Sequence, residues 1–144
     1  MVMNKRTVLL ICVALVLAGA RFFMDSHKRP NIQIFMEKSR RSIMKGSDTP
    51  AIVFHFPTNY PVTSIEVVDA EDARTNKYPH ALWHLVASDK PVPTKSFAYG
   101  ANIKGMNPEI ATAEPEPLEL DTQYVLLVEA GKNLKGKLPF QLPY

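Results

Sequence analysis

Cysteine is nearly absent from this chain: Cys12 is the only one in 144 residues, and it lies in an apolar run near the N-terminus. The remaining sequence can therefore form no internal disulfide bond and no cysteine-based zinc site. A body of about 100 residues can do without both, because domains of this size bury about 60–70% of the surface that their unfolded chains expose. Its stability must come from an apolar core.

The common motifs of catalysis are also missing. The sequence has no GxSxG nucleophile motif, no HExxH metal motif and no glycine-rich phosphate loop, and it has only six glycines in all. No nucleophile, base and oxyanion donor can be nominated together from such a pattern. We therefore predict that the protein is not an enzyme and holds no cofactor or metal ion. An enzyme whose site has no sequence signature is the remaining alternative.

Positive charge is scarce where a nucleic-acid-binding domain would need it. Residues 21–48 carry seven basic and three acidic side chains, whereas residues 49–144 carry eight basic and eleven acidic ones. A binder of DNA or RNA carries its basic surface on the folded domain. The overall charge of +3 therefore belongs to the N-terminal part of the chain, and we predict no nucleic-acid partner.

The one long apolar run lies at the N-terminus. Residues 1–6 are basic, residues 7–17 are apolar, and Ala18 and Ala20 are the small residues of a cleavage site before Arg21. This order is typical of a secretory signal, and 14 uncharged residues are short for a membrane span of about 20. Ala20 stands where a lipoprotein signal needs cysteine, which argues against lipidation. Residues 22–24 extend the apolar run if the segment is retained as an anchor, and the basic residues that follow oppose export.

These features predict three parts of the chain. Residues 1–20 are a signal peptide or membrane anchor, residues 21–48 a basic juxtamembrane tether with one strand near 31–36, and residues 49–144 a folded domain. We expect the protein in the periplasm, or anchored in the inner membrane with the domain facing the periplasm.

Short β-like runs separated by turn residues fill the domain. Apolar residues alternate in the segments 51–56, 63–69, 79–88, 95–99, 124–130 and 137–142, and each is bounded by residues such as proline, asparagine or aspartate. No segment after Leu17 keeps a helical apolar period over three turns. The pattern predicts an all-β sandwich of about seven strands, and Trp83 is expected in its core.

One segment resembles a known family. Residues 118–130 resemble the late strand of fibronectin type III domains, although Leu120 and Asp121 replace the proline and glycine that are usual there. The resemblance implies an immunoglobulin- or fibronectin III-like sandwich, with Tyr124 as a tyrosine corner whose hydroxyl group bonds nearby backbone. It implies no function. The matching positions are Leu118, Thr122, Tyr124, Val128 and Ala130.

Candidate binding residues are few. His80 and His84 lie four residues apart, which on a strand separates them by about 13 Å, too far for one metal ion. The acidic segment 66–72 lacks the spacing of a calcium loop and is predicted to be a solvated turn. A second acidic set is interleaved with prolines in a long connection, where a recognition surface is plausible on a sandwich; it comprises Glu114, Glu116, Glu119 and Asp121.

Together these features predict an exported cell-envelope module that binds a protein partner and contacts the membrane through its N-terminal segment. A periplasmic inhibitor or immunity-type protein that binds one enzyme is the alternative.

Overall fold

The computed structural model describes residues 4–26, 31–40 and 50–142. The chain divides into two units, residues 1–30 and residues 31–144. The first unit contains helix α1 (Lys5–Ser26), which continues six residues beyond the segment predicted as signal or anchor. Within the described residues, none of the helices combines the length and apolarity that a membrane crossing requires.

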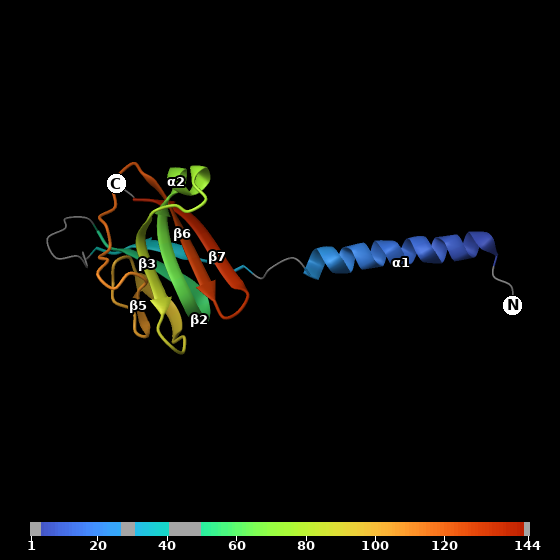
Figure 1. Cartoon of the computed structure of the whole chain (residues 1–144), viewed down its shortest axis with the longest axis horizontal. Coiled ribbons are helices and arrows are strands. Elements are labelled where there is room, and N and C mark those ends of the chain that lie inside the picture. The colour runs from blue at the N-terminus through green and yellow to red at the C-terminus, as the bar shows by residue number, and fades with distance from the viewer. Residues whose placement is uncertain (1–3, 27–30, 41–49, 143–144) are drawn as a thin grey trace. The chain divides into compact units, whose positions relative to one another are not determined.

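The second unit contains seven antiparallel strands, all linked through β2 (Figure 1). It begins at Asn31, so part of the segment predicted as a tether lies inside this unit. The strands are β1 (Phe35–Lys38), β2 (Ile52–Asp69), β3 (Ala81–Ala87), β4 (Pro93–Ala98), β5 (Met106–Pro108), β6 (Gln123–Ala130) and β7 (Leu134–Gln141).

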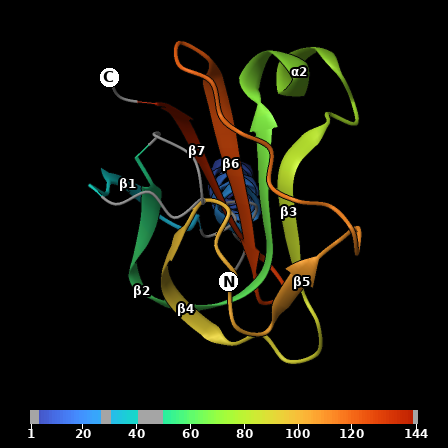
Figure 2. The same ribbon diagram turned by 90° about the vertical axis from the view of Figure 1, so that its left-hand side faces the viewer.

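Strand β2 runs through both layers of the domain. Its first half pairs with β1 and β4, and its second half pairs with β3 and β6. Figure 2 shows β2 curving from the side of β1 and β4 to the side of β3 and β6. The sequence predicted two strands here, 51–56 and 63–69, and that prediction was wrong. The connecting residues 57–61 contain two prolines but stay extended. The φ angle of proline is compatible with an extended backbone, and its missing N–H group is tolerated where the ladder of hydrogen bonds to the partner strand is interrupted.

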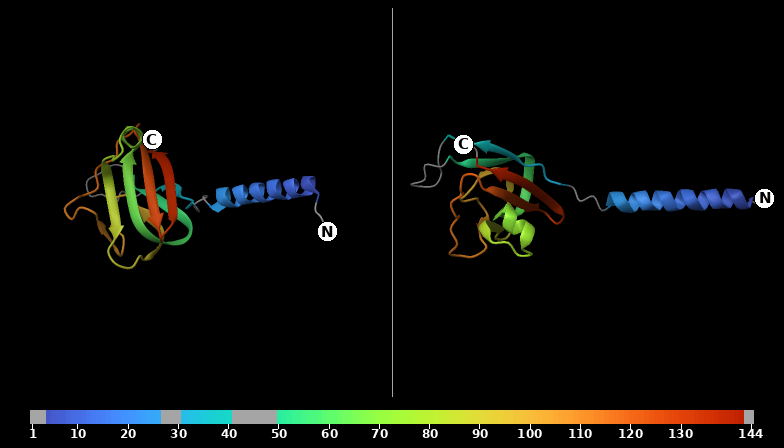
Figure 3. Two further views of the ribbon diagram at one scale, coloured as in Figure 1. Left: turned by 45° about the vertical axis from the view of Figure 1, so that its right-hand side comes forward. Right: turned by 90° about the horizontal axis from the view of Figure 1, so that it is seen from above.

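The larger layer has the strand order β5-β3-β2-β6-β7. Strands β3, β2, β6 and β7 lie side by side in the left view of Figure 3. Their inward residues alternate along each strand, as in Tyr124, Leu126 and Val128 of β6, which are at most 2% exposed. This alternation is the sequence signal that predicted β6.

Aromatic rings join the two layers. Phe54 of β2 lies with its ring 5.2 Å from that of Phe140 on β7, and Phe97 of β4 lies 6.1 Å from Trp83 on β3. Tyr99 then contacts Trp83 edge-on, with ring centroids 5.2 Å apart. Such pairs add about 0.5–1.5 kcal/mol each beyond the burial of their area. The core is therefore an aromatic layer between two sheets.

Three elements differ from the prediction. The strand expected at 31–36 is displaced to β1, although Ile32 and Ile34 are buried, because this segment packs against Gly136 at the edge of β7. The three-residue strand β5 was not predicted. The acidic turn is helix α2 (Ala70–Thr75), which begins there because the carboxylate of Asp69 accepts the backbone N–H groups of Glu71 and Asp72.

Candidate functional site

A pocket of 430 Å³ lies along the side of β3 that faces away from β2, next to its short pairing with β5; we call it the β3-edge pocket. It is lined by residues 80–85 of β3 and its approach, by residues 100–102, and by residues 108–110 and 113–116 of the connection between β5 and β6. The pocket therefore forms where a long, largely irregular connection runs beside a strand. Binding residues are often found on such connections, because a rigid scaffold holds them in place.

Backbone bonds fasten this connection to β3 at two points. The N–H of Glu109 donates to the carbonyl of His84 at 3.2 Å, and the N–H of Glu116 donates to the carbonyl of Leu82 at 3.0 Å. The hydroxyl group of Tyr99 also donates to the carbonyl of Glu116, at 2.6 Å. From the segment between the two points, Ile110, Ala113, Glu114 and Pro115 line the pocket.

Two histidine–glutamate pairs reinforce the same attachment. Nε2 of His80 lies 2.5 Å from Oε1 of Glu116, and Nδ1 of His84 lies 2.6 Å from Oε2 of Glu109. The first pair is largely exposed, whereas the side chain of His84 is only 21% exposed. Each histidine thus has its own glutamate partner on the connection.

The structure separates the four predicted acidic residues. Glu114 and Glu116 line the β3-edge pocket, together with Glu109, which sequence reasoning missed. Glu119 and Asp121 do not line it; Asp121 instead has a positive φ of 64° in the turn before β6. Glu109 could not have been found from the sequence, because nothing local indicates that residue 109 returns to residue 84.

Trp83 and Tyr124 are both buried aromatic residues. Trp83 is 5% exposed and closes the inner side of the β3-edge pocket. Tyr124 is 2% exposed, and its hydroxyl oxygen accepts the backbone N–H of Glu119 at 2.8 Å. That bond spans five residues just before β6, as the resemblance implied for a tyrosine corner.

Burial raises the pKa of the Tyr99 phenol, and the charge of nearby Glu116 raises it further. The phenol therefore stays protonated and keeps its donated bond to the Glu116 carbonyl. This arrangement holds the wall of the pocket at neutral pH.

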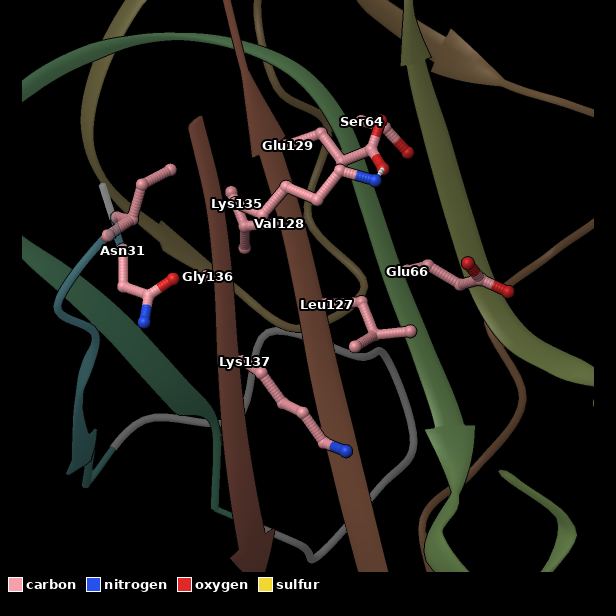
Figure 4. A pocket seen from close by; sticks show the side chains of 10 residues that line it. Asn31, Ser64, Glu66, Leu127, Val128, Glu129, Lys135, Gly136 and Lys137 are labelled. Atoms are coloured by element: carbon pink, nitrogen blue, oxygen red, sulfur yellow. Dashed lines mark ion pairs between the residues drawn. The ribbon is translucent and has the colours of Figure 1, made fainter. Parts of the chain in front are cut away.

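A second depression lies on the outer face of the larger layer; we call it the outer-face depression (Figure 4). It has a volume of 540 Å³ and is lined by residues of β2, β6 and β7 and by residues 31–32. Lys135 and Glu129 form an ion pair across it at 2.9 Å. Ser64 lies at its rim, on β2.

The acidic segment 66–72 has a structural role at helix α2. A backbone N–H from His80, a side-chain bond from Asn76 and the charge of His80 lower the pKa of Asp72. Asp72 therefore ties the approach to β3 back to α2, whereas Glu66 lies on β2 and lines the outer-face depression.

Among the described residues, no group of three or more histidine, cysteine, aspartate or glutamate side chains is placed to hold a metal ion. No protein-family model matches the chain, and neither a curated protein nor a solved structure does so. The function proposed below is therefore inferred from the geometry of the domain.

Proposed function

We propose that this protein is an exported cell-envelope binding module whose domain is an immunoglobulin- or fibronectin III-like sandwich. The strand order supports the sandwich type. Strands of immunoglobulin-like domains are named A to G in chain order. If the first half of β2 is taken as strand B and its second half as strand C, then the first layer, formed by β1, β2 and β4, corresponds to strands A, B and E. The second layer then reads C′-C-F-G in β3, β2, β6 and β7, which is the order of that fold. The bond from Glu119 to Tyr124 adds the tyrosine corner.

The binding surface in this proposal is the β3-edge pocket. Its lining residues include three glutamates, at 109, 114 and 116, and no lysine or arginine. Glu109 and Glu116 are paired with histidines, but Glu114 forms no hydrogen bond or ion pair with a described residue. A negative field of this kind attracts cationic ligands and sets the register of a partner.

The partner in this proposal is a protein that presents a lysine- or arginine-bearing segment to the pocket. The buried indole of Trp83 and the carbon chains around it provide an apolar floor, and the glutamates provide the charged rim. Lysine and arginine side chains match such a site, because their apolar stems pack while their charged ends remain at the rim. Export through the N-terminal segment places the encounter in the periplasm or at the membrane.

A peptide titration tests the proposed surface. Fluorescein-labelled hexa-arginine is titrated with the full-length protein at low salt, with hexaglutamate as the control peptide, and anisotropy gives Kd. Replacing Glu114 with glutamine removes one exposed charge contact of about 0.2–1 kcal/mol, so Kd should rise about 1.4- to five-fold. Glu119→Gln is the matched control, because Glu119 lies on the same connection but outside the pocket. Equal effects of the two substitutions, or equal binding of hexaglutamate, would contradict the proposal.

A fractionation experiment tests export. The intact mass of the chromosomally expressed protein shows whether residues 1–20 are removed, and protease added to spheroplasts shows which side of the membrane the domain faces. A domain that is protected in intact spheroplasts would contradict the periplasmic assignment.

A further inference from the structure

Three polar side chains meet beside β3: Ser64 of β2, His84 of β3 and Glu109, the residue that follows β5. Oγ of Ser64 lies 3.2 Å from Nε2 of His84, and Nδ1 of the same imidazole lies 2.6 Å from Oε2 of Glu109. The serine thus contacts one ring nitrogen and the carboxylate contacts the other. This is the atom order in which a histidine can take a proton from a serine hydroxyl group while a carboxylate holds the ring.

A β-bulge turns Ser64 toward the imidazole. Val62 and Ile65 are both buried, at 1% and 0% exposure, although they are three residues apart and a regular strand would place them on opposite faces. The pairing of β2 with β6 is irregular between Val62 and Ser64, and this irregularity absorbs the extra residue, Thr63. Bulges of this kind redirect side chains and are common beside active sites.

The neighbouring strands place the other two groups. His84 of β3 is the direct partner of Glu66, and Val86 is the partner of Ser64, so the imidazole reaches Ser64 diagonally. Glu109 is fixed by its own backbone, whose N–H donates to the carbonyl of His84. Ser64 and His84 are therefore held by the pairing of β2 with β3, and Glu109 is held by its backbone bond to His84 just after β5.

The carboxylate determines the tautomer of a neutral His84. An ionised carboxylate can only accept hydrogen bonds, so Nδ1 of His84 must carry the proton in this contact. The lone pair of Nε2 then faces the hydroxyl group of Ser64 and can accept its proton. The partial burial of His84, at 21% exposure, limits competition from water.

We propose that Ser64 is a nucleophile, with His84 as its general base and Glu109 as a positioning residue, and that it accepts acyl groups from small carboxylic esters. Oγ of Ser64 attacks the ester carbonyl carbon while its proton moves to Nε2 of His84. The carbon–oxygen bond of the leaving alcohol breaks, and that alcohol takes the proton from His84. Water, deprotonated by His84, then cleaves the acyl-serine and regenerates the hydroxyl group.

The outer-face depression gives an ester access to Ser64. Ser64 lines this depression, together with Lys135 and Lys137 of β7 (Figure 4). Of these two cations, Lys135 lies across Glu129 from Ser64 and pairs with Glu129 at 2.9 Å, so its ammonium group is the one that the proposal assigns to charge developing on the carbonyl oxygen. The ester enters from the outer face of the sheet, and His84 and Glu109 also line the β3-edge pocket, so the inference shares two residues with the proposed binding surface.

Covalent labelling tests the assignment. The full-length protein is treated with a fluorophosphonate probe, which transfers its phosphonyl group to an activated serine with loss of fluoride, and mass spectrometry locates the adduct. We expect an adduct on Ser64 that is at least ten-fold above the level on Ser96, an exposed serine of β4 that lies across from His55 but forms no hydrogen bond with its imidazole. His84→Gln should lower the labelling rate at Ser64 at least ten-fold, and labelling of Ser96 should not change.

The role of Glu109 needs a separate readout. Glu109→Gln should lower the labelling rate at Ser64, because an amide no longer requires the proton to sit on Nδ1 of His84, and Glu109→Asp should restore part of the rate. Labelling of Ser64 no stronger than that of Ser96, or a rate that His84→Gln leaves unchanged while the fluorescence of Trp83 shows a native core, would overturn the proposal.

Discussion

Replacing Tyr124 with phenylalanine removes one hydroxyl group from the folded domain and leaves the ring in place. The ring is buried, at 2% exposure, and packs 5.7 Å from that of Phe140, so its apolar contacts should survive. The lost interaction is the 2.8 Å bond that the hydroxyl oxygen accepts from the N–H of Glu119. The substitution therefore isolates a single hydrogen bond at the start of β6.

The expected cost follows from that bond. A hydrogen bond of this kind contributes about 0.5–1.5 kcal/mol to stability, and a donor left unsatisfied adds more. The side chain of Glu119 is exposed, so water can reach its amide, and we expect a total of about 1 kcal/mol. For a domain of this size that lowers Tm by about 3–6 °C. With a urea m-value of about 2 kcal/mol/M, it lowers the midpoint by about 0.5 M.

The single tryptophan provides the assay. Trp83 lies in the core, so its fluorescence follows urea unfolding of the full-length chain. Tyr78→Phe is the matched control, because Tyr78 is 83% exposed and should contribute almost nothing through its hydroxyl group. Hydrogen exchange then locates the effect: the amide of Glu119 should exchange faster in the Tyr124 variant. A midpoint equal to that of Tyr78→Phe, with unchanged exchange at residue 119, would refute the tyrosine-corner argument.

Three further perturbations have defined outcomes. Gly136→Ala should destabilise by about 1–3 kcal/mol, because its Cβ would lie 2.9 Å from Cδ1 of Ile34 and 3.0 Å from a backbone oxygen. Gly131→Ala is the control: it has open space around the added Cβ but a φ of +56°, so it should cost only about 1 kcal/mol. If the contact with residues 32 and 34 is the cause, the amide of Ile32, which donates to the carbonyl of Lys135, should exchange faster in Gly136→Ala but not in Gly131→Ala. The lowered pKa of Asp72 means that its contribution is present above the ordinary value of 3.8 and is lost as pH falls through the lower, folded-state value. Asp72→Asn should thus flatten the decline of the urea midpoint between pH 5 and about 2, and an unchanged slope would contradict this. Because the pKa of Tyr99 is raised in the folded domain, its phenol stabilises the fold fully below the ordinary pKa of 10.0, and this contribution decreases as pH rises above that value. Between about pH 10 and 11 the urea midpoint of Tyr99→Phe should therefore fall less than that of the parent protein.

Local patterns predicted much of the fold. The strands at β3, β4, β6 and β7 follow from alternating apolar residues, because a half-buried strand must place every second side chain in the core. The continuity of β2 did not follow from such patterns. Residues 57–61 have the composition of a turn; their pairing with β4 is irregular after His55 and resumes with Tyr60 opposite Thr94 and Pro61 opposite Pro93, which keeps the segment within the strand. Tertiary context overrides local preference in such segments.

The sites were less predictable than the fold. The acidic, proline-bearing connection could be singled out from its composition, and Glu114 and Glu116 do line a pocket. The contact between Ser64, His84 and Glu109 could not be predicted, because it joins positions up to 45 residues apart and depends on a bulge at Thr63. A short sequence motif cannot indicate three residues that come together from distant parts of the chain.

The course of β2 has a consequence for how the domain folds. This one strand pairs with four others, and its partners in β6 are far away in the chain, as in the pairing of Val62 with Ala130. Neither layer can be completed without β2, so one layer formed without the other should not be a stable folding intermediate. Closing such long-range pairings costs loop entropy before their contacts are gained, which slows folding in all-β proteins. The domain should therefore fold slowly and in a single cooperative step, with the nascent chain held open until β6 has been synthesised.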